Sequence, residues 1–386
     1  MHSFFVRILL SITILASLMS QVPLILEMGY DVYFKAVWFV PFIIFLFHHS
    51  KTMTEPPMMF MYIAVGTMTA YCAIMDAVSL EKYLNVDIYN MWISMMVAAT
   101  SYSIYRHYGS DGMLRDIAVC SIISSLVLCY VLQTQYFVDY DLMDRVFAFN
   151  AKNSMGQILL NCAIVIVLFP ISRIMLFRFV QWFTIVPIVV MLFMLKSRST
   201  LVGFFFVVFY MILQSRDKRI RWLTLAVVLA FIIYLLSNAE AFNTIVYGIL
   251  MAGRDVNDVN EVSSERIQTI SEALEIIPDN ILFGVGNKYV DCMPISMMLQ
   301  FGFIGFVIVI TYIGILFRKI VKLDLKNNIH LATFLIFVAM VLNSLFEAWP
   351  PFGPGVKCFM LWMMLGFSLA LESKPNRQGI AKPLYE

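Results

Sequence analysis

The chain has 386 residues, of which 61% are apolar and only 13% are charged, and its mean hydropathy is +0.83. Water-soluble domains are close to half apolar and a quarter charged, so this composition excludes a soluble globular protein. The formal net charge is only +2, which gives no reason to expect a nucleic-acid partner.

Twelve apolar stretches are expected to form helices, because a helix needs about 20 apolar residues to cross the hydrocarbon core of a bilayer. They lie near residues 5–25, 33–49, 57–76, 89–106, 115–136, 154–171, 175–195, 199–214, 220–237, 293–317, 329–347 and 356–371. The first stretch resembles a signal peptide, but it is longer than a signal's apolar region and no clean cleavage site follows, so we expect a spanning helix. The sequence predicts an all-α polytopic membrane protein with one transmembrane domain over residues 1–372 and a polar cytoplasmic tail over 373–386.

The lysines and arginines predict the orientation, because short cytoplasmic loops retain them. With the amino terminus inside, most of the 27 fall on inner segments, and both termini are then cytoplasmic. The exceptions that gather on the outer side include Arg145, Lys152, Lys196, Arg198, Arg254 and Arg266. These misplaced cations are the first indication of a functional site.

A long outer loop is expected over residues 238–291, and loops of this length in a compact bundle are usually functional. The second half of this loop is predicted to form an amphipathic helix. Its apolar face would carry Ile267, Ile270, Leu274 and Ile277, with Arg266 beside them. Ser263 or Ser264 could cap this helix, whose start would then be an anion site beside an arginine. The alternative is an arginine that reaches to lipid headgroups.

Two further outer segments carry cations at helix starts. In the segment 194–203, Lys196 and Arg198 lie between apolar runs with almost no loop, so Arg198 is expected to enter the bundle, where a charge requires a partner or an anionic ligand. Arg145, Lys152 and Asn153 lie at the mouth of the next outer helix. Asn153 or Ser154 could instead cap that helix, and Arg145 could pair with nearby aspartates.

Arginines from separate segments favour a lipid phosphate or pyrophosphate as the ligand, because they bind its oxygens bidentately.

Four stretches resemble the bacterial O-antigen polymerase and ligase family: RVFAFNAKNSMG from Arg145, KSRST from Lys196, SERIQTISEALEIIPDNILFGVGN from Ser264, and MMLQFGFIGF. Gly284, Gly286, Gly302 and Gly305 occupy the family's glycine positions, and Asn343, Ser344 and Glu347 are similar to its penultimate helix. Together they cover about the last two thirds of the chain. Ligases of the family usually carry a histidine where this chain has Asp291, and this departure favours the polymerase branch.

The resemblance implies a GT-C-like glycosyltransferase of the bacterial inner membrane that moves a glycan from undecaprenyl pyrophosphate onto another lipid-linked repeat unit on the extracytoplasmic face. Its partners would be membrane lipid, a chain-length regulator and a flippase. We expect the following site residues: catalytic Arg198, Arg266, Asp291 and Glu347, and substrate-binding Arg145, Lys152, Asn153, Lys196 and Arg254. The outer face carries no histidine cluster, and no metal or cofactor is expected.

Three other functions remain open from the sequence. A ligase would use the same donor and transfer the finished glycan to lipid A core or another acceptor. A lipid-linked oligosaccharide flippase or another secondary transporter would also use many helices and internal arginines. A non-catalytic scaffold of an envelope assembly complex is the third.

Overall fold

The structure is a computed structural model of the chain. It describes residues 2–30, 33–34, 36–137, 152–214, 221–222, 229–230, 233–234, 236–243, 246, 248, 263, 266–348, 351–352 and 356–373. Arg145, Arg254 and Ser264, three residues of the expected site and loop, therefore lie outside the described residues, as do most of the predicted stretch 220–237 and the whole tail from 374.

The described residues form helices, and no strand occurs among them. The helices are α1 (Ser3–Met19), α2 (Pro23–Glu27), η1 (Ala36–Trp38), α4 (Phe39–His48), α5 (Ser50–Met53), α6 (Pro56–Val78), α7 (Val86–Tyr108), α8 (Asp111–Gln135), α9 (Lys152–Leu168), α10 (Met175–Phe183), α11 (Ile185–Met194), α12 (Arg198–Gln214), α14 (Ala239–Phe242), α16 (Arg266–Ile276), η3 (Ile277–Asn280), α17 (Met293–Val321), α18 (Asn328–Ser344) and α19 (Val356–Glu372).

Each predicted apolar stretch except 220–237 contains a described helix. Within the described chain, four helical segments are long and apolar enough to cross a membrane: Pro56–Val78, Asp111–Gln135, Met175–Met194 and Met293–Val321. Met175–Met194 is divided into α10 and α11 at Thr184. Pro187 explains the break, because it has no N–H to donate to the carbonyl of Phe183. The prediction of an all-α protein is thus confirmed for the described residues, which include four helical segments long and apolar enough to span a membrane.

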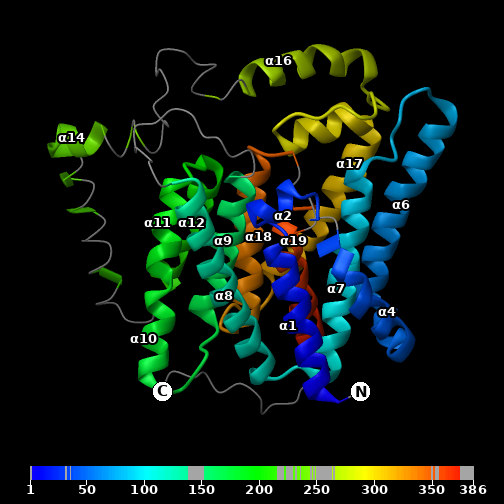
Figure 1. Ribbon diagram of the computed structural model, residues 1–386. Helices are drawn as coiled ribbons and strands as arrows, with labels where there is room; N and C mark the ends of the chain where they lie inside the picture. Colours follow the sequence, from blue (N-terminus) through cyan, green and yellow to red (C-terminus); the bar gives the residue numbers. More distant parts are fainter. Residues whose placement is uncertain are drawn as a thin grey trace.

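The helices run side by side as a bundle, and α16 lies across one end of it (Figure 1). Helix α1 begins at the opposite end, at the bottom of the view, where α8 and α18 also begin. Helices α9 and α12 begin at the end that α16 covers. The predicted site residues at the starts of α9, α12 and α16 therefore share one end of the bundle.

Helices α7 and α19 form the centre of the bundle, and most of their side chains are buried. They approach most closely at Gly366, where a Cβ would lie 2.5 Å from the carbonyl oxygen of Ala98 and 2.8 Å from the amide nitrogen of Tyr102. Neither atom can move without displacing the backbone of α7. A glycine in α19 thus allows the two central helices to touch, as small residues do in membrane bundles.

The register of α9 against its neighbours can be read from two glycines. A Cβ on Gly156 would lie 3.0 Å from Oγ1 of Thr200, and one on Gly203 would lie 3.4 Å from both Leu160 and Ala339. Helix α9 therefore runs parallel to α12, and near Leu160 it lies level with Ala339 of the antiparallel α18. Arg198, two residues before Thr200, is level with the first turn of α9.

Substituting Gly366 with leucine should lower stability by about 1–3 kcal/mol or more, because the side chain has no space between α7 and α19. The matched control is Gly66→Leu in α6, where a Cβ would meet nothing within 4 Å. We expect a clearly lower unfolding temperature in detergent for Gly366→Leu alone. Equal unfolding temperatures would contradict the close packing of the two helices.

Candidate functional site

Helix α16 buries one narrow face on which Arg266 lies. Arg266, Ile270, Ala273 and Ile277 recur at helical spacing, and Ala273 is buried in a small cluster with Val290 and Leu299. The predicted apolar face was partly wrong, because Ile267 and Leu274 are about half exposed. The reason is that only a narrow strip of α16 contacts the bundle, and its centre is Ala273 rather than the larger residues.

The predicted cap at Ser263 or Ser264 stays a prediction, because residues 249–262 and 264–265 lie outside the described residues and Ser263 is itself helical. The hydroxyl of Ser263 accepts a hydrogen bond from the amide of Ile267 at 3.4 Å. The continuously described part of α16 begins at Arg266. The guanidinium of Arg266 faces the bundle, and its side chain is only 19% exposed.

Two carboxylates flank the guanidinium of Arg266. Its Nε lies 3.6 Å from Oδ2 of Asp291, and its Nη2 lies 3.5 Å from Oε1 of Glu347. The Glu347 side chain is 10% exposed and that of Asp291 is 44% exposed. The structure thus brings together three of the four predicted catalytic residues, one carboxylate being buried and the other open to the surroundings.

Asn153 joins this cluster from a third segment. Its Nδ2 donates a hydrogen bond to the same Oε1 of Glu347 that faces Arg266. The capping role considered for Asn153 and Ser154 was wrong, because α9 begins at Lys152 and both residues lie inside the helix. Asn153 instead projects from the first turn of α9 toward the segment after α18, and Glu347 has the buried hydrogen-bonding arrangement.

The segment that leads to Asp291 crosses α17 at two glycines. Gly302 interrupts α17 with φ +62° and ψ −170°, and Gly284 has φ +74°, both in the left-handed half of the backbone map. A Cβ on Gly284 would lie 2.5 Å from the carbonyl oxygen of Gln300, and one on Gly302 would overlap the Leu282 carbonyl. Only glycines allow segment 281–286 to lie directly on the interruption in α17.

Hydrogen bonds across this crossing replace those that α17 loses at its interruption. The amide of Val285 donates to the carbonyl of Leu299 at 2.8 Å, and that of Phe303 donates to the carbonyl of Ile281 at 2.7 Å. The free carbonyls are therefore paired, as buried backbone groups must be. The crossing gives a physical reason for the glycine pattern that the sequence analysis identified.

The amino-terminal helices support the crossing, and sequence reasoning missed this role. The hydroxyl of Tyr71 donates to the Phe301 carbonyl at 2.7 Å, and that of Tyr83 donates to the Gly284 carbonyl at 2.9 Å. Asn85 Nδ2 donates to Oε1 of Gln300 at 2.8 Å. These contacts join residues more than 200 positions apart in the sequence, and no local pattern could have indicated them.

Three other predicted cations, all within the described residues, lie at the same end of the bundle. Lys152 opens α9 and Arg198 opens α12, and the register of the two helices places Arg198 level with the first turn of α9. Arg198 is half-buried, but Lys196 is the more deeply buried cation, at 2% exposure, and has a left-handed backbone with φ 49°. The three-residue turn between α11 and α12 leaves these side chains within the bundle end.

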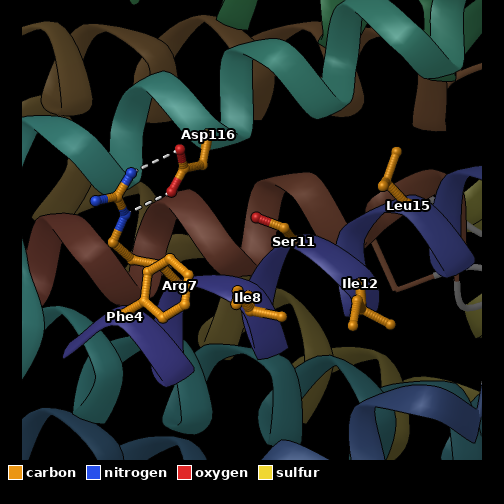
Figure 2. A pocket seen from close by; sticks show the side chains of 7 residues that line it. All are labelled: Phe4, Arg7, Ile8, Ser11, Ile12, Leu15 and Asp116. Atoms are coloured by element: carbon orange, nitrogen blue, oxygen red, sulfur yellow. Dashed lines mark hydrogen bonds and ion pairs between the residues drawn. The ribbon is translucent and has the colours of Figure 1, made fainter. Parts of the chain in front are cut away.

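The opposite end of the bundle holds a different kind of arginine. Arg7 of α1 makes two short bonds to Asp116 of α8, Nε to Oδ2 at 2.6 Å and Nη2 to Oδ1 at 2.8 Å. Figure 2 shows this pair beside an open pocket that Phe4, Ile8, Ile12 and Leu15 line along α1. The pocket is lined by these apolar residues together with Ser11 and the Arg7–Asp116 pair, and none of its lining residues belongs to the Arg266 site.

No protein-family model matches the chain, and no curated protein matches it.

The crossing makes a direct prediction about Gly302. Alanine there would occupy a backbone region open essentially to glycine alone and would overlap the Leu282 carbonyl, at a cost on the order of 3 kcal/mol. Gly314→Ala is the matched control, because it lies on the same helix and meets nothing within 4 Å; it should be neutral or stabilising by about 1 kcal/mol or less. An unfolding temperature of Gly302→Ala equal to that of the parent protein would contradict the crossing.

Proposed function

We propose that this protein is a membrane glycosyltransferase that polymerises polysaccharide repeat units, taking the growing glycan from undecaprenyl pyrophosphate and joining it to another lipid-linked unit. The observation that carries the proposal is Arg266, a largely buried arginine between Asp291 and Glu347, at the same end of the bundle as Lys152, Lys196 and Arg198. Cations from three separate helices, α9, α12 and α16, thus share the end of the bundle where we propose that a diphosphate binds.

The contacts of Arg266 leave it able to bind an anion. Its two carboxylate contacts, at 3.5 and 3.6 Å, are longer than the 2.7–2.9 Å typical of charge-assisted hydrogen bonds. Its Nε makes no hydrogen bond to the described protein atoms. A guanidinium has five N–H donors, so a pyrophosphate can bind without removal of either carboxylate. Arg198, at the level of the first turn of α9, is the second cation proposed for the clamp.

The two carboxylates suit different tasks. Glu347 is buried and accepts hydrogen bonds from Asn153 and Arg266, an arrangement that holds the guanidinium in place. Asp291 is exposed on one side and can receive a proton from a bound hydroxyl. We therefore assign Asp291 as the general base and Glu347 as a positioning residue.

In the proposed step, the acceptor hydroxyl oxygen attacks the anomeric carbon of the growing glycan and forms the new glycosidic bond. The bond from that carbon to the pyrophosphate oxygen breaks, and its electron pair leaves with undecaprenyl pyrophosphate. Asp291 takes the hydroxyl proton. Arg266 and Arg198 stabilise the charge that develops on the leaving group, and one preorganised donor of this kind is worth about 3–4 kcal/mol.

The distribution of charge supports an extracytoplasmic site. Arg7, Arg106 and Lys319 lie at the end where α1 begins, as the positive-inside rule requires of the cytoplasmic side. We propose that the shorter apolar helices also cross the membrane and that the Arg266 end faces outward. The lipid-linked substrates would then meet the site at the outer membrane surface.

Arg266→Ala and Arg198→Ala should each reduce polymerisation by about 100-fold or more, because each removes a donor to the leaving pyrophosphate. The measurement is the length distribution of the polysaccharide in cells that accumulate the variants at normal levels. Arg173→Ala is the control, since Arg173 is exposed in the connection before α10, and it should leave chain length unchanged. Full-length polysaccharide from either site variant would refute the clamp, and transfer to lipid A core instead of repeat units would favour a ligase.

Sidedness can be measured independently of activity. A cysteine at exposed Lys288, beside the site, should react with a membrane-impermeant maleimide in intact cells, whereas one at exposed Lys51 should react only after permeabilisation. Cys292→Ser provides the background, because the other five cysteines are buried. The reverse pattern of labelling would place the site in the cytoplasm and exclude the proposed reaction.

A further inference from the structure

Two buried amides lie beside the Glu347 cluster. Gln157 of α9 and Asn343 of α18 are each only 2% exposed. Neither the Nε2 nor the Oε1 of Gln157, nor the Oδ1 of Asn343, makes a hydrogen bond to the described protein atoms. These are two polar side chains that the fold itself leaves unsatisfied.

The register of α9 and α18 places the two amides at one level. Asn153 bonds Glu347, and seven residues further along α9, Leu160 meets Gly203 together with Ala339, eight residues before Glu347. Gln157 is four residues after Asn153 and Asn343 is four residues before Glu347. The pair therefore lies about one helical turn, roughly 5 Å, deeper in the bundle than the Asn153–Glu347 bond.

Leaving such groups unpaired has a cost that a purely structural role does not explain. A buried amide without a partner costs about 1–3 kcal/mol, and apolar side chains of similar shape would pack without that cost. Other buried amides of this fold differ in this respect: Gln181 of α10 accepts from the amide of Ile171 at 3.0 Å and donates to the carbonyl of Phe169 at 2.9 Å, whereas Nδ2 of Asn90 also has no partner among the described atoms. Gln157 and Asn343 are distinguished by their position, because the two lie together about one turn from the charged Asn153–Glu347 contact.

We infer that Gln157 and Asn343 form a subsite for the sugar next to the diphosphate of the lipid-linked donor. An amide presents a donor and an acceptor on one rigid plane, which matches a sugar hydroxyl because that group also donates and accepts. With the diphosphate at Arg266 and Arg198, the sugar would occupy the next turn inward. This inference rests on the proposed function and adds to it the recognition of the first sugar.

The test compares two lipids that differ only in the sugar: undecaprenyl pyrophosphate, bare or bearing one N-acetylglucosamine. Purified Gln157→Met and Asn343→Leu should each bind the glycosylated lipid about tenfold more weakly, equal to about 1.4 kcal/mol, with unchanged affinity for the bare lipid. Their unfolding temperatures without lipid should equal or exceed that of the parent, because each removes an unpaired amide. Gln181→Met, the matched control, should unfold at a lower temperature and retain the parent's preference between the lipids.

The outcomes separate this inference from the proposed function. If the parent binds the bare lipid and the two variants bind both lipids as the parent does, the sugar subsite is wrong and the diphosphate clamp stands. The subsite is also wrong if Gln157→Met and Asn343→Leu unfold the protein, since the amides would then be structural. If the parent fails to bind even the bare lipid, the clamp itself is wrong and the subsite falls with it.

Discussion

The site depends on one buried carboxylate. Glu347 follows α18, and its Oε1 receives Asn153 from α9 and Arg266 from α16, so three distant segments meet at one atom. A charge this deeply buried is stable only where such donors surround it. The rest of the described contact of α16 with the bundle is a small apolar cluster around Ala273. Glu347 at 3.5 Å and Asp291 at 3.6 Å are thus the two charged contacts that orient Arg266.

The backbone crossing at Gly284 and Gly302 explains why the cluster of Arg266, Asp291 and Glu347 has one open side. The crossing of Gly284 over Gly302 is made of backbone atoms and holds the segment that ends at Asp291. Arg266 consequently stands between a carboxylate fixed inside the bundle and one at its surface. Because the two carboxylates differ in exposure rather than in chemistry, the surroundings alone can assign one to positioning and the other to proton transfer.

The sequence predicted most of the described helices, because apolar length is a local signal. It named Arg266 from the placement of charge and Asp291 and Glu347 from the resemblance, but it did not predict that the two carboxylates flank the guanidinium. It did not predict that Asn153 bonds Glu347, since a polar residue in a first helical turn suits a cap equally well. The interruption at Gly302 was also missed, because it depends on a segment that docks from outside the helix. Apolar spacing placed the buried face of α16 inexactly, since that face centres on alanine.

Comparison of the two arginines shows what distinguishes a site from a structural ion pair. Arg7 and Arg266 are both partly buried beside carboxylates, yet Arg7 makes bonds of 2.6 and 2.8 Å whereas Arg266 has contacts of 3.5 and 3.6 Å. Short bidentate bonds use the donors that an anion would need. The guanidinium of Arg266, which is held by longer contacts, keeps these donors available. Unpaired Gln157 and Asn343 lie on the same side as Arg266, so the proposed ligand would meet both charge and unused hydrogen-bonding groups at that end of the bundle.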